Sequence, residues 1–290
     1  MNTTKAFAFI ALSVALFGCQ EPTVPALFHQ SWVHVQPSWS NDGKTVAFSA
    51  TIHGTAGIYL VDTTGLNVRL LHAGNDAGCS WSPDSKWLAF MENNNLFEIS
   101  SAGDSLIPLT TSGLDLFPAW SPDGKKIAFN RYNLGIYIRN LETSQDTSVF
   151  QSGEFASWHP NGDLVAISQL GAGSDGSAVY GFYAMRADTA VWRTLTTLVV
   201  PGLCTTPAVS PADSTEKEIV FSLTQSVGYT ELWKIDLSSG NVIQLTDDGG
   251  DYPAWSPDGS KIVYTRTQQG DGGLWIMNAD GSGKYRLTSP

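Results

Sequence analysis

The sequence is poor in positive charge and has no apolar run long enough to cross a membrane. Its 290 residues include 16 Lys and Arg against 27 Asp and Glu, a formal net charge of −11. Nucleic acid needs a basic surface to bind to, so it is excluded as a partner. The chain also lacks G-x-S-x-G, H-E-x-x-H and P-loop motifs, which argues against the enzyme classes that these motifs serve.

Cysteine is scarce, and one of the three cysteines lies near the N-terminus. Cys19 ends the sequence Leu-Phe-Gly-Cys, which looks like a bacterial lipobox, after an apolar run at 6–17 of the length of a signal peptide. We expect a lipoprotein signal peptide at 1–18 and a lipid anchor on Cys19 followed by a tether at 19–36. Gln20 favours the outer membrane, facing the periplasm. Because Phe17 is unusual in a lipobox, cleavage by the ordinary signal peptidase is the alternative.

A twelve-residue pattern recurs along the rest of the chain. Its clearest copy, PAWSPDGSKIVY, begins at Pro253. Earlier copies begin at Pro37, Cys79, Pro118, Ala156 and Pro207. The Trp of the pattern recurs as Trp39, Trp81, Trp120, Trp158 and Trp255, and Val209 replaces it in the remaining copy. Steps of 38 to 51 residues are typical of propellers and repeat arrays.

Each copy has the chemistry of a β-hairpin. In one of them Pro122 fixes φ for a turn, Asp123 can accept a hydrogen bond from nearby backbone, and Gly124 supplies a positive φ. A third strand follows, as in GIYIRN at 135–140, and a fourth ends in Leu-Thr, as in YRLT at 285–288. The sequence therefore predicts an all-β fold, a six-bladed β-propeller of four-stranded antiparallel blades at 37–290. The repeated Trp and Asp are expected to serve packing and turns.

The pattern PxWSPDGxxIAF, with its IYxM-type strand and RLT ending, resembles the WD40-like repeat of TolB-type propellers. The resemblance implies a bacterial cell-envelope protein, and propellers serve binding, scaffolding and catalysis alike. TolB itself has an α/β domain ahead of its propeller. Only residues 20–36 separate Cys19 from the first repeat here, which argues against a direct part in the Tol–Pal system.

Three irregularities bear on the architecture. The stretch 170–180 in the fourth blade forms a long Gly- and Ser-rich loop, either a contact loop or a tolerated insertion. In the fifth blade Val209 and a lengthened turn predict relaxed packing. The ring closes either through a strand from residues 24–28 or through the C-terminal YRLT alone.

Cys79 and Cys204 fall in opposite blades, too far apart for a disulfide, so we expect two free thiols.

Loops between the second and third strands, and loops that join blades, share one face, called here the variable face. Four or five residues before each Trp position stands a column of mostly acidic residues: His34, Asp76, Asp115, Glu154, Cys204 and Asp251. We expect its acidic members and His34 to ring the channel mouth and attract a cation or a basic side chain. A surrounding rim is expected from His53, Arg131, Tyr132, Tyr180, Tyr229 and Arg266. Ordinary solvent-facing loop residues are the alternative for both groups.

These features predict a non-enzymatic, membrane-anchored, monomeric propeller that binds a protein or peptide in the cell envelope. No cofactor is expected, although a channel cation such as calcium is an alternative. Two further alternatives stay open. One is a glycan-binding protein that uses Trp and Tyr residues. The other is a polysaccharide lyase-like enzyme that uses His34, His53, Arg131 and Arg266 with a metal.

Overall fold

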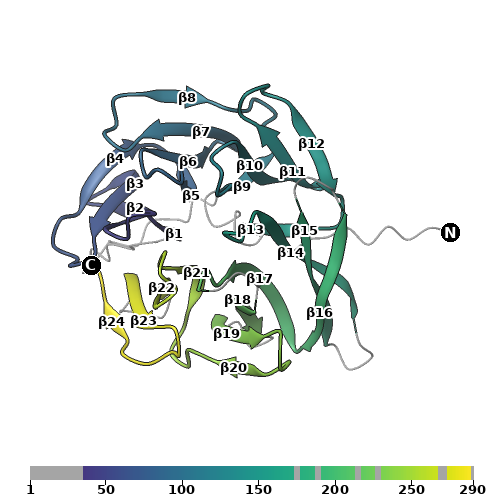
Figure 1. The fold of residues 1–290 in the computed structure, drawn as a ribbon. Coiled ribbons are helices and arrows are strands. Elements are labelled where there is room, and N and C mark those ends of the chain that lie inside the picture. The colour runs from purple at the N-terminus through teal and green to yellow at the C-terminus, as the bar shows by residue number, and fades with distance from the viewer. Residues whose placement is uncertain are drawn as a thin grey trace, which may run out of the picture.

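The computed structural model describes residues 35–172, 177–186, 191–212, 217–225, 230–266 and 273–288. Twenty-four β-strands form six four-stranded antiparallel sheets in these residues, and none of the described segments is a helix capable of spanning a membrane. The sheets stand as blades in a ring around a central axis (Figure 1). The six-bladed β-propeller predicted from the repeat is confirmed.

Each blade is one contiguous stretch of chain, with its first strand innermost. Blade 1 contains β1 (Val35–Trp39), β2 (Thr45–Ile52), β3 (Thr55–Asp62) and β4 (Arg69–Ala73). Blade 2 contains β5 (Asp76–Trp81), β6 (Trp87–Glu92), β7 (Asn95–Ser100) and β8 (Leu106–Pro108). Blade 3 contains β9 (Asp115–Trp120), β10 (Lys126–Arg131), β11 (Gly135–Asn140) and β12 (Asp146–Phe150).

The second half of the ring repeats this order. Blade 4 contains β13 (Glu154–Trp158), β14 (Asp163–Ala172), β15 (Ala178–Arg186) and β16 (Trp192–Val200). Blade 5 contains β17 (Gly202–Val209), β18 (Glu218–Gln225), β19 (Thr230–Asp236) and β20 (Val242–Gln244). Blade 6 contains β21 (Asp251–Trp255), β22 (Lys261–Arg266), β23 (Gly273–Asn278) and β24 (Tyr285–Arg286).

The ring closes by side-chain packing between blades 1 and 6. Trp39, Val46 and Phe48 of blade 1 share a buried cluster with Val263 and Ile276 of blade 6. The outer strand of blade 6 is β24, as the YRLT pattern predicts. The alternative closing strand at 24–28 lies outside the described residues, as does Cys19.

The repeated Trp residues pack between neighbouring blades. The indole Nε1–H of Trp81 donates to the carbonyl of Ser38 in the preceding blade at 3.1 Å. Those of Trp158 and Trp255 donate in the same way to the carbonyls of Ala119 and Ala208, both at 3.0 Å. One residue type thus fills the wedge between two blades and fixes their spacing.

The turn after each inner strand is held by a Ser–Asp pair. The Ser121 hydroxyl donates to Asp123 at 2.6 Å and accepts the Lys126 N–H at 2.9 Å, while Asp123 accepts the Lys125 N–H at 3.0 Å. Equivalent Ser-to-Asp bonds recur in blades 1, 2 and 6. The repeated Asp residues are therefore turn residues, as the sequence indicates.

The Leu-Thr ending has a similar local role. The Thr110 hydroxyl oxygen accepts the N–H of Leu96 at 2.9 Å, and Thr246 and Thr288 do the same for Leu232 and Leu274. The Thr side chain thereby ties the loop after the outer strand back to the third strand of its own blade.

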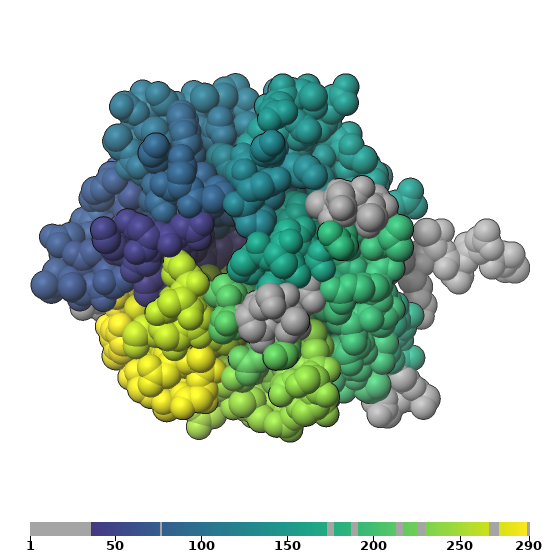
Figure 2. Space-filling model, viewed as in Figure 1, coloured from purple at the N-terminus to yellow at the C-terminus, as the bar shows by residue number. Residues whose placement is uncertain are grey.

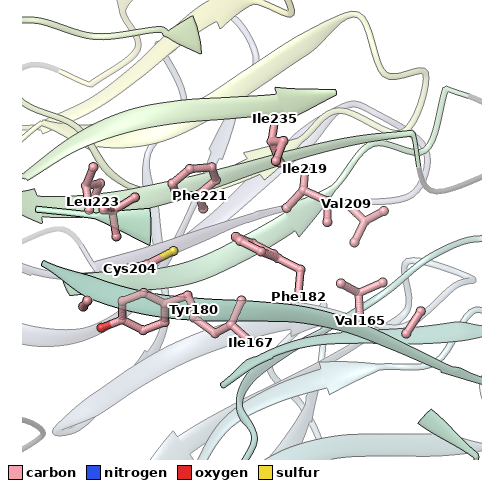
Figure 3. Packing of buried hydrophobic residues seen from close by; sticks show 13 residues of the cluster. Val165, Ile167, Tyr180, Phe182, Cys204, Val209, Ile219, Phe221, Leu223 and Ile235 are labelled. Atoms are coloured by element: carbon pink, nitrogen blue, oxygen red, sulfur yellow. The ribbon is translucent and has the colours of Figure 1, made fainter. Parts of the chain in front are cut away.

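The interface of blades 4 and 5 corrects one expectation. Without a Trp at Val209, the wedge is filled by an extensive buried cluster that includes Tyr180, Phe182, Phe221 and Leu223 (Figure 3). The rings of Phe182 and Phe221 meet edge to face with centroids 5.5 Å apart. Relaxed packing was therefore the wrong prediction, because longer strands on both sides supply the missing apolar volume.

Both remaining cysteines are buried free thiols, as predicted, with Cys79 in β5 and Cys204 in β17. Burial raises the pKa of the Cys204 thiol. Figure 3 shows Cys204 inside the blade 4–5 cluster, where it acts as a small apolar side chain.

Replacing the indole by a ring without an N–H tests the inter-blade hydrogen bond. Trp255 and Trp39 are equally buried, but the Nε1–H of Trp39 has no acceptor among the described residues. We expect Trp255→Phe to lower the free energy of unfolding by about 1–3 kcal/mol more than Trp39→Phe, because it leaves the Ala208 carbonyl unpaired. Chemical denaturation of both variants measures this. Equal losses would contradict the role of the hydrogen bond.

Candidate functional site

A β-bulge interrupts the innermost strand of all six blades. In each pair of first and second strands the register shifts just before the Trp position. The residue three positions before the Trp has a positive φ in each blade, between 46° and 59°, and these residues are Gln36, Gly78, Phe117, Phe155, Thr206 and Tyr252. A left-handed backbone is costly for bulky residues, so its presence in every blade marks a fixed feature of the ring.

Side chains of the preceding blade support this strained backbone. The N–H of Phe155 donates to Asn130 Oδ1 at 3.0 Å, and the N–H of Tyr252 donates to Ser222 Oγ at 3.2 Å. Asn130 and Ser222 are buried in their own second strands. In these two blades the bulge is therefore supported by the neighbouring blade.

Five of the six bulged residues, all except Gly78, line a central channel of about 550 Å³. Gln36, Phe117, Phe155, Thr206 and Tyr252 lie toward its end on the variable face, since they precede the Trp along the inner strands. The rings of Phe117 and Phe155 pack together with centroids 5.1 Å apart. Figure 2 shows the molecule hollowed where the blades meet at the centre.

The channel lining in the described residues contains no Asp, Glu, Lys or Arg side chain. It consists mostly of Trp, Pro, Ala and Ser from the inner strands and turns and of the aromatic residues of the mouth, together with Gln36, Asn41, Cys79, Thr206 and Val209. The bulge explains the difference from the expected acidic ring, because the extra residue changes which side chains face the axis. The residues that line the channel mouth are those at the bulge, three positions before the Trp. The acidic residues stand one or two positions earlier in the sequence.

Asp115 of the acidic column is fully buried in an ion pair. The Arg131 guanidinium donates to its two oxygens at 2.7 and 3.2 Å. Arg131 also donates to Asp146 at 2.8 Å and lies over the ring of Tyr137, 4.5 Å from its centroid. A residue expected in the ring and one expected in the rim are thus each other's partners. Together they stabilise blade 3 and offer no unpaired charge to a ligand.

Glu154 and Asp251 are half-buried carboxylates on the first residues of β13 and β21. Burial raises the pKa of Glu154 above its ordinary value. Burial also raises the pKa of Asp251, to about 6, against a smaller opposite effect of its hydrogen bond with Ser222. Both carboxylates therefore hold their protons more tightly than exposed carboxylates do.

The other expected rim residues have separate surroundings. Tyr180 is buried in the blade 4–5 cluster, and burial raises its pKa to about 12. Arg266 pairs with Asp248 at 3.1 Å and lies over the ring of Trp275. His53 is exposed at the β2–β3 turn and Tyr132 is half-buried. Asp76 begins β5, and His34 and Tyr229 lie outside the described residues.

No group of three or more His, Cys, Asp or Glu side chains could hold a metal ion in the part of the chain that the structure describes. The sequence does contain a signal for the bulge column, since Phe117, Phe155 and Tyr252 directly precede the repeated pattern. The recurrence of an aromatic residue at that position could have identified the channel mouth, but the acidic residues just before it were chosen instead.

Comparison with known proteins points to one kind of propeller. The family model of the dipeptidyl peptidase IV N-terminal region matches residues 40–117. The Tol-Pal system protein TolB of Francisella tularensis subsp. holarctica is 25% identical, over 76% of this chain and 54% of the relative. The crystal structure of TolB from Acinetobacter baumannii has a TM-score of 0.70 at 22% identity, over 83% of this chain and 62% of that one.

The chain thus forms a β-propeller that is similar to the propeller of TolB. It spans about half the length of the curated TolB relatives that it matches. An oligogalacturonate lyase in complex with manganese superposes on the propeller with a TM-score of 0.57 at 16% identity, over 87% of this chain and 76% of the lyase. That likeness shows the fold alone.

The raised pKa of Asp251 predicts a pH-dependent stability of the propeller. Between pH 3.8 and about 6 the folded chain retains a proton that the unfolded chain has lost, so this carboxyl lowers stability as pH rises through that window. We expect Asp251→Asn to raise the free energy of unfolding by about 1–3 kcal/mol at neutral pH and by little near pH 4. Urea denaturation at several pH values measures this.

Asp258→Asn is the matched control in the same blade. A hydrogen bond from Ser256 lowers the pKa of Asp258 to about 2. The stability that this carboxylate contributes is therefore present in full above pH 3.8 and is lost as the pH falls from 3.8 to about 2. This substitution should lower stability at neutral pH. An Asp251→Asn gain of equal size at both ends of the pH range would refute the assignment.

Proposed function

We propose that this propeller is a non-enzymatic binding module of the bacterial cell envelope that takes a protein or peptide partner at its variable face. The observation that carries the proposal is the channel mouth, where Phe117, Phe155 and Tyr252 stand on a backbone fixed by the bulge. The likeness to TolB supports an envelope role. A channel of about 550 Å³ is within the usual range of ligand pockets.

The chemistry of the mouth favours an uncharged, apolar contact. Aromatic residues are enriched at protein interfaces, where they bury a large area at a small cost in conformational entropy. The half-buried rings of Phe117 and Phe155 are held by the ring of blades, so little ordering is required when a partner binds. Binding through this site should therefore depend only weakly on salt, unlike binding to an acidic ring.

Blade 4 adds a raised wall beside the mouth. Its strands β14 and β15 contain 10 and 9 residues, and the end of β14 from Gln169 to Ala172 is exposed. A hairpin that rises next to a concave mouth enlarges the surface available to one partner. Catalysis is not part of the proposal, because Arg131 and Arg266 are held by carboxylates and aromatic rings.

Removing the two phenyl rings without straining the backbone tests the binding site. Blade 2 already has Gly78 at the bulge, so the double variant Phe117→Gly, Phe155→Gly copies a conformation that the ring accepts. We expect it to lose the partner that the parent chain captures by crosslinking in intact cells, as identified by mass spectrometry. Leu66→Gly, at an exposed turn of blade 1, is the control and should keep the partner.

The thermal unfolding of the double variant shows whether its fold is intact. Relief of two left-handed Phe residues should offset part of the lost packing. A folded double variant that still captures the same partner would rule out the channel mouth. A parent chain that captures no protein and copurifies with glycan would replace the protein partner by a sugar ligand.

We also propose that Cys19 carries the lipid anchor and that the propeller faces the periplasm from the outer membrane. The support is the apolar run at 6–17 and the Leu-Phe-Gly-Cys sequence. Cys19→Ser should move the chain from the membrane fraction to the soluble fraction, as measured by fractionation and immunoblotting. Unchanged membrane association together with an unlipidated N-terminal peptide in mass spectra would contradict the anchor.

A further inference from the structure

A chain of three hydrogen-bonded side chains leads from the channel into the interface of blades 5 and 6. Thr206, the bulged residue of blade 5, is half-buried and lines the channel. Its hydroxyl donates to Ser222 Oγ at 2.8 Å. Ser222 is fully buried in β18 and forms a hydrogen bond with the side chain of Asp251, the first residue of β21. These three side chains, called here the relay, connect the channel lining to a carboxyl group of the next blade.

An ionised Asp251 fixes the direction of the relay. A carboxylate only accepts hydrogen bonds, so Ser222 must donate its hydroxyl hydrogen to Asp251. The Ser222 oxygen is then left to accept, and it accepts from Thr206 and, at 3.2 Å, from the Tyr252 N–H. The Thr206 hydrogen is therefore used inside the protein. The lone pairs of the Thr206 oxygen are left for a group in the channel, because Ser222 is the one partner of this hydroxyl among the described residues.

Thr206 has a backbone conformation that β-branched residues rarely adopt. Its φ is 46°, and the equivalent residue of blade 2 is Gly78. A β-branched side chain raises the free energy of this conformation, and strained residues of this kind cluster at functional sites. The strain at Thr206 therefore supports a role for its hydroxyl in the channel.

We propose that the Thr206 hydroxyl oxygen accepts an N–H group of the bound peptide and that a proton on Asp251 reverses this preference. The inference rests on the proposed function, since the ligand is the peptide partner of the same channel mouth. The rings of Phe117 and Phe155 offer no oxygen or nitrogen acceptor. An N–H group that leaves water for such an apolar site needs an acceptor, because an unpaired buried N–H is costly. The relay thus makes Thr206 a specificity-determining residue of the mouth.

Proton uptake reverses the relay without breaking a covalent bond among its three side chains. A protonated Asp251 has an O–H group, which can donate to Ser222 Oγ. Ser222 then donates its own hydrogen to Thr206 Oγ1, and the Thr206 hydrogen turns toward the channel. Thr206 thereby changes from an acceptor to a donor, so that a carbonyl group of the ligand is preferred to an N–H. The added proton stays on Asp251, and each hydroxyl keeps one hydrogen.

Asp251 can change its charge near neutral pH, because no cationic side chain of the strands packed against it holds it ionised. Burial raises its pKa to about 6. Those strands are β1, β17, β18, β19 and β22, of which β1 has no titratable residue. The basic residues of the other four have separate partners, which are Glu218 for Lys234, Asn278 for Lys261 and Asp248 for Arg266. The remaining titratable residues of these strands and of β21 are Cys204, Glu231, Asp236, Tyr252 and Tyr264.

NMR titration of the full chain with ¹³C-labelled Asp and Thr tests the relay without a ligand. We expect the Asp251 carboxyl resonance to titrate with a midpoint of about pH 6 and the Thr206 side-chain resonances to follow with the same midpoint. Ser222→Ala should raise the Asp251 midpoint, because it removes a hydrogen bond that favours the ionised form, and Thr206 should no longer follow.

Ser49→Ala is the matched control for this titration. Ser49 is a buried serine of β2 that lies opposite Val35 as Ser222 lies opposite Thr205, and its hydroxyl meets Cys79 in place of an acidic residue. The control should leave the Asp251 and Thr206 titrations unchanged.

Indole and N-methylindole are matched probes of the preference for an N–H group, because only indole can donate a hydrogen bond. We expect indole to bind about three- to tenfold more tightly at about pH 8 than at about pH 5, as measured from the Thr206 resonances. N-methylindole should bind equally at the two pH values, and Ser222→Ala should remove most of the difference for indole.

The outcomes separate this contact from the proposed function. A Thr206 that stays unchanged while Asp251 titrates, or that still follows it in Ser222→Ala, would overturn the relay. Indole that leaves Thr206 unperturbed, or that binds equally at the two pH values, would overturn the selection of an N–H group. If both tests succeed but the chain captures no protein in cells, the protein partner is wrong and the N–H contact stands.

Discussion

The indole placed between neighbouring blades is the interaction on which the rest of the propeller depends. A four-stranded sheet exposes two faces, and each must be covered by a neighbour. Trp81, Trp158 and Trp255 fill the wedge and donate a hydrogen bond to the inner strand of the preceding blade. At these three interfaces the spacing of the inner strands is therefore set largely by one indole.

Blade packing also creates the candidate binding surface. The left-handed residues at the channel mouth are held by polar side chains of the preceding blade, as with Asn130 and Phe155 or Ser222 and Tyr252. The contacts that stabilise the ring thus also shape the candidate binding surface. A substitution at Asn130 acts on the mouth without touching a ligand, because it removes the partner of the strained Phe155 N–H. The Tyr252 N–H has a second acceptor, Asp251 Oδ1 at 2.8 Å, so a substitution at Ser222 should have a smaller effect.

The repeat was enough to predict the blades, the turns and the free thiols. Trp spacing, the Ser-Pro-Asp-Gly turn and the Leu-Thr ending each have a local cause that appears in sequence order. The channel lining could not be predicted in this way, since a bulge of one residue reverses which side chains face the axis. The pairing of Asp115 with Arg131 was likewise missed. The two residues were assigned to different loops, and they lie opposite each other only because β9 pairs with β10 in this register.

The clearest departure from the repeat lies between blades 4 and 5. Val209 replaces the Trp between blades 4 and 5, and the longer strands that compensate also raise the wall beside the mouth. The loss of one indole is thus accompanied by longer strands in blade 4. Restoring Trp at Val209 would overfill a cluster that Phe182 and Phe221 already occupy, so the irregularity is now part of the fold.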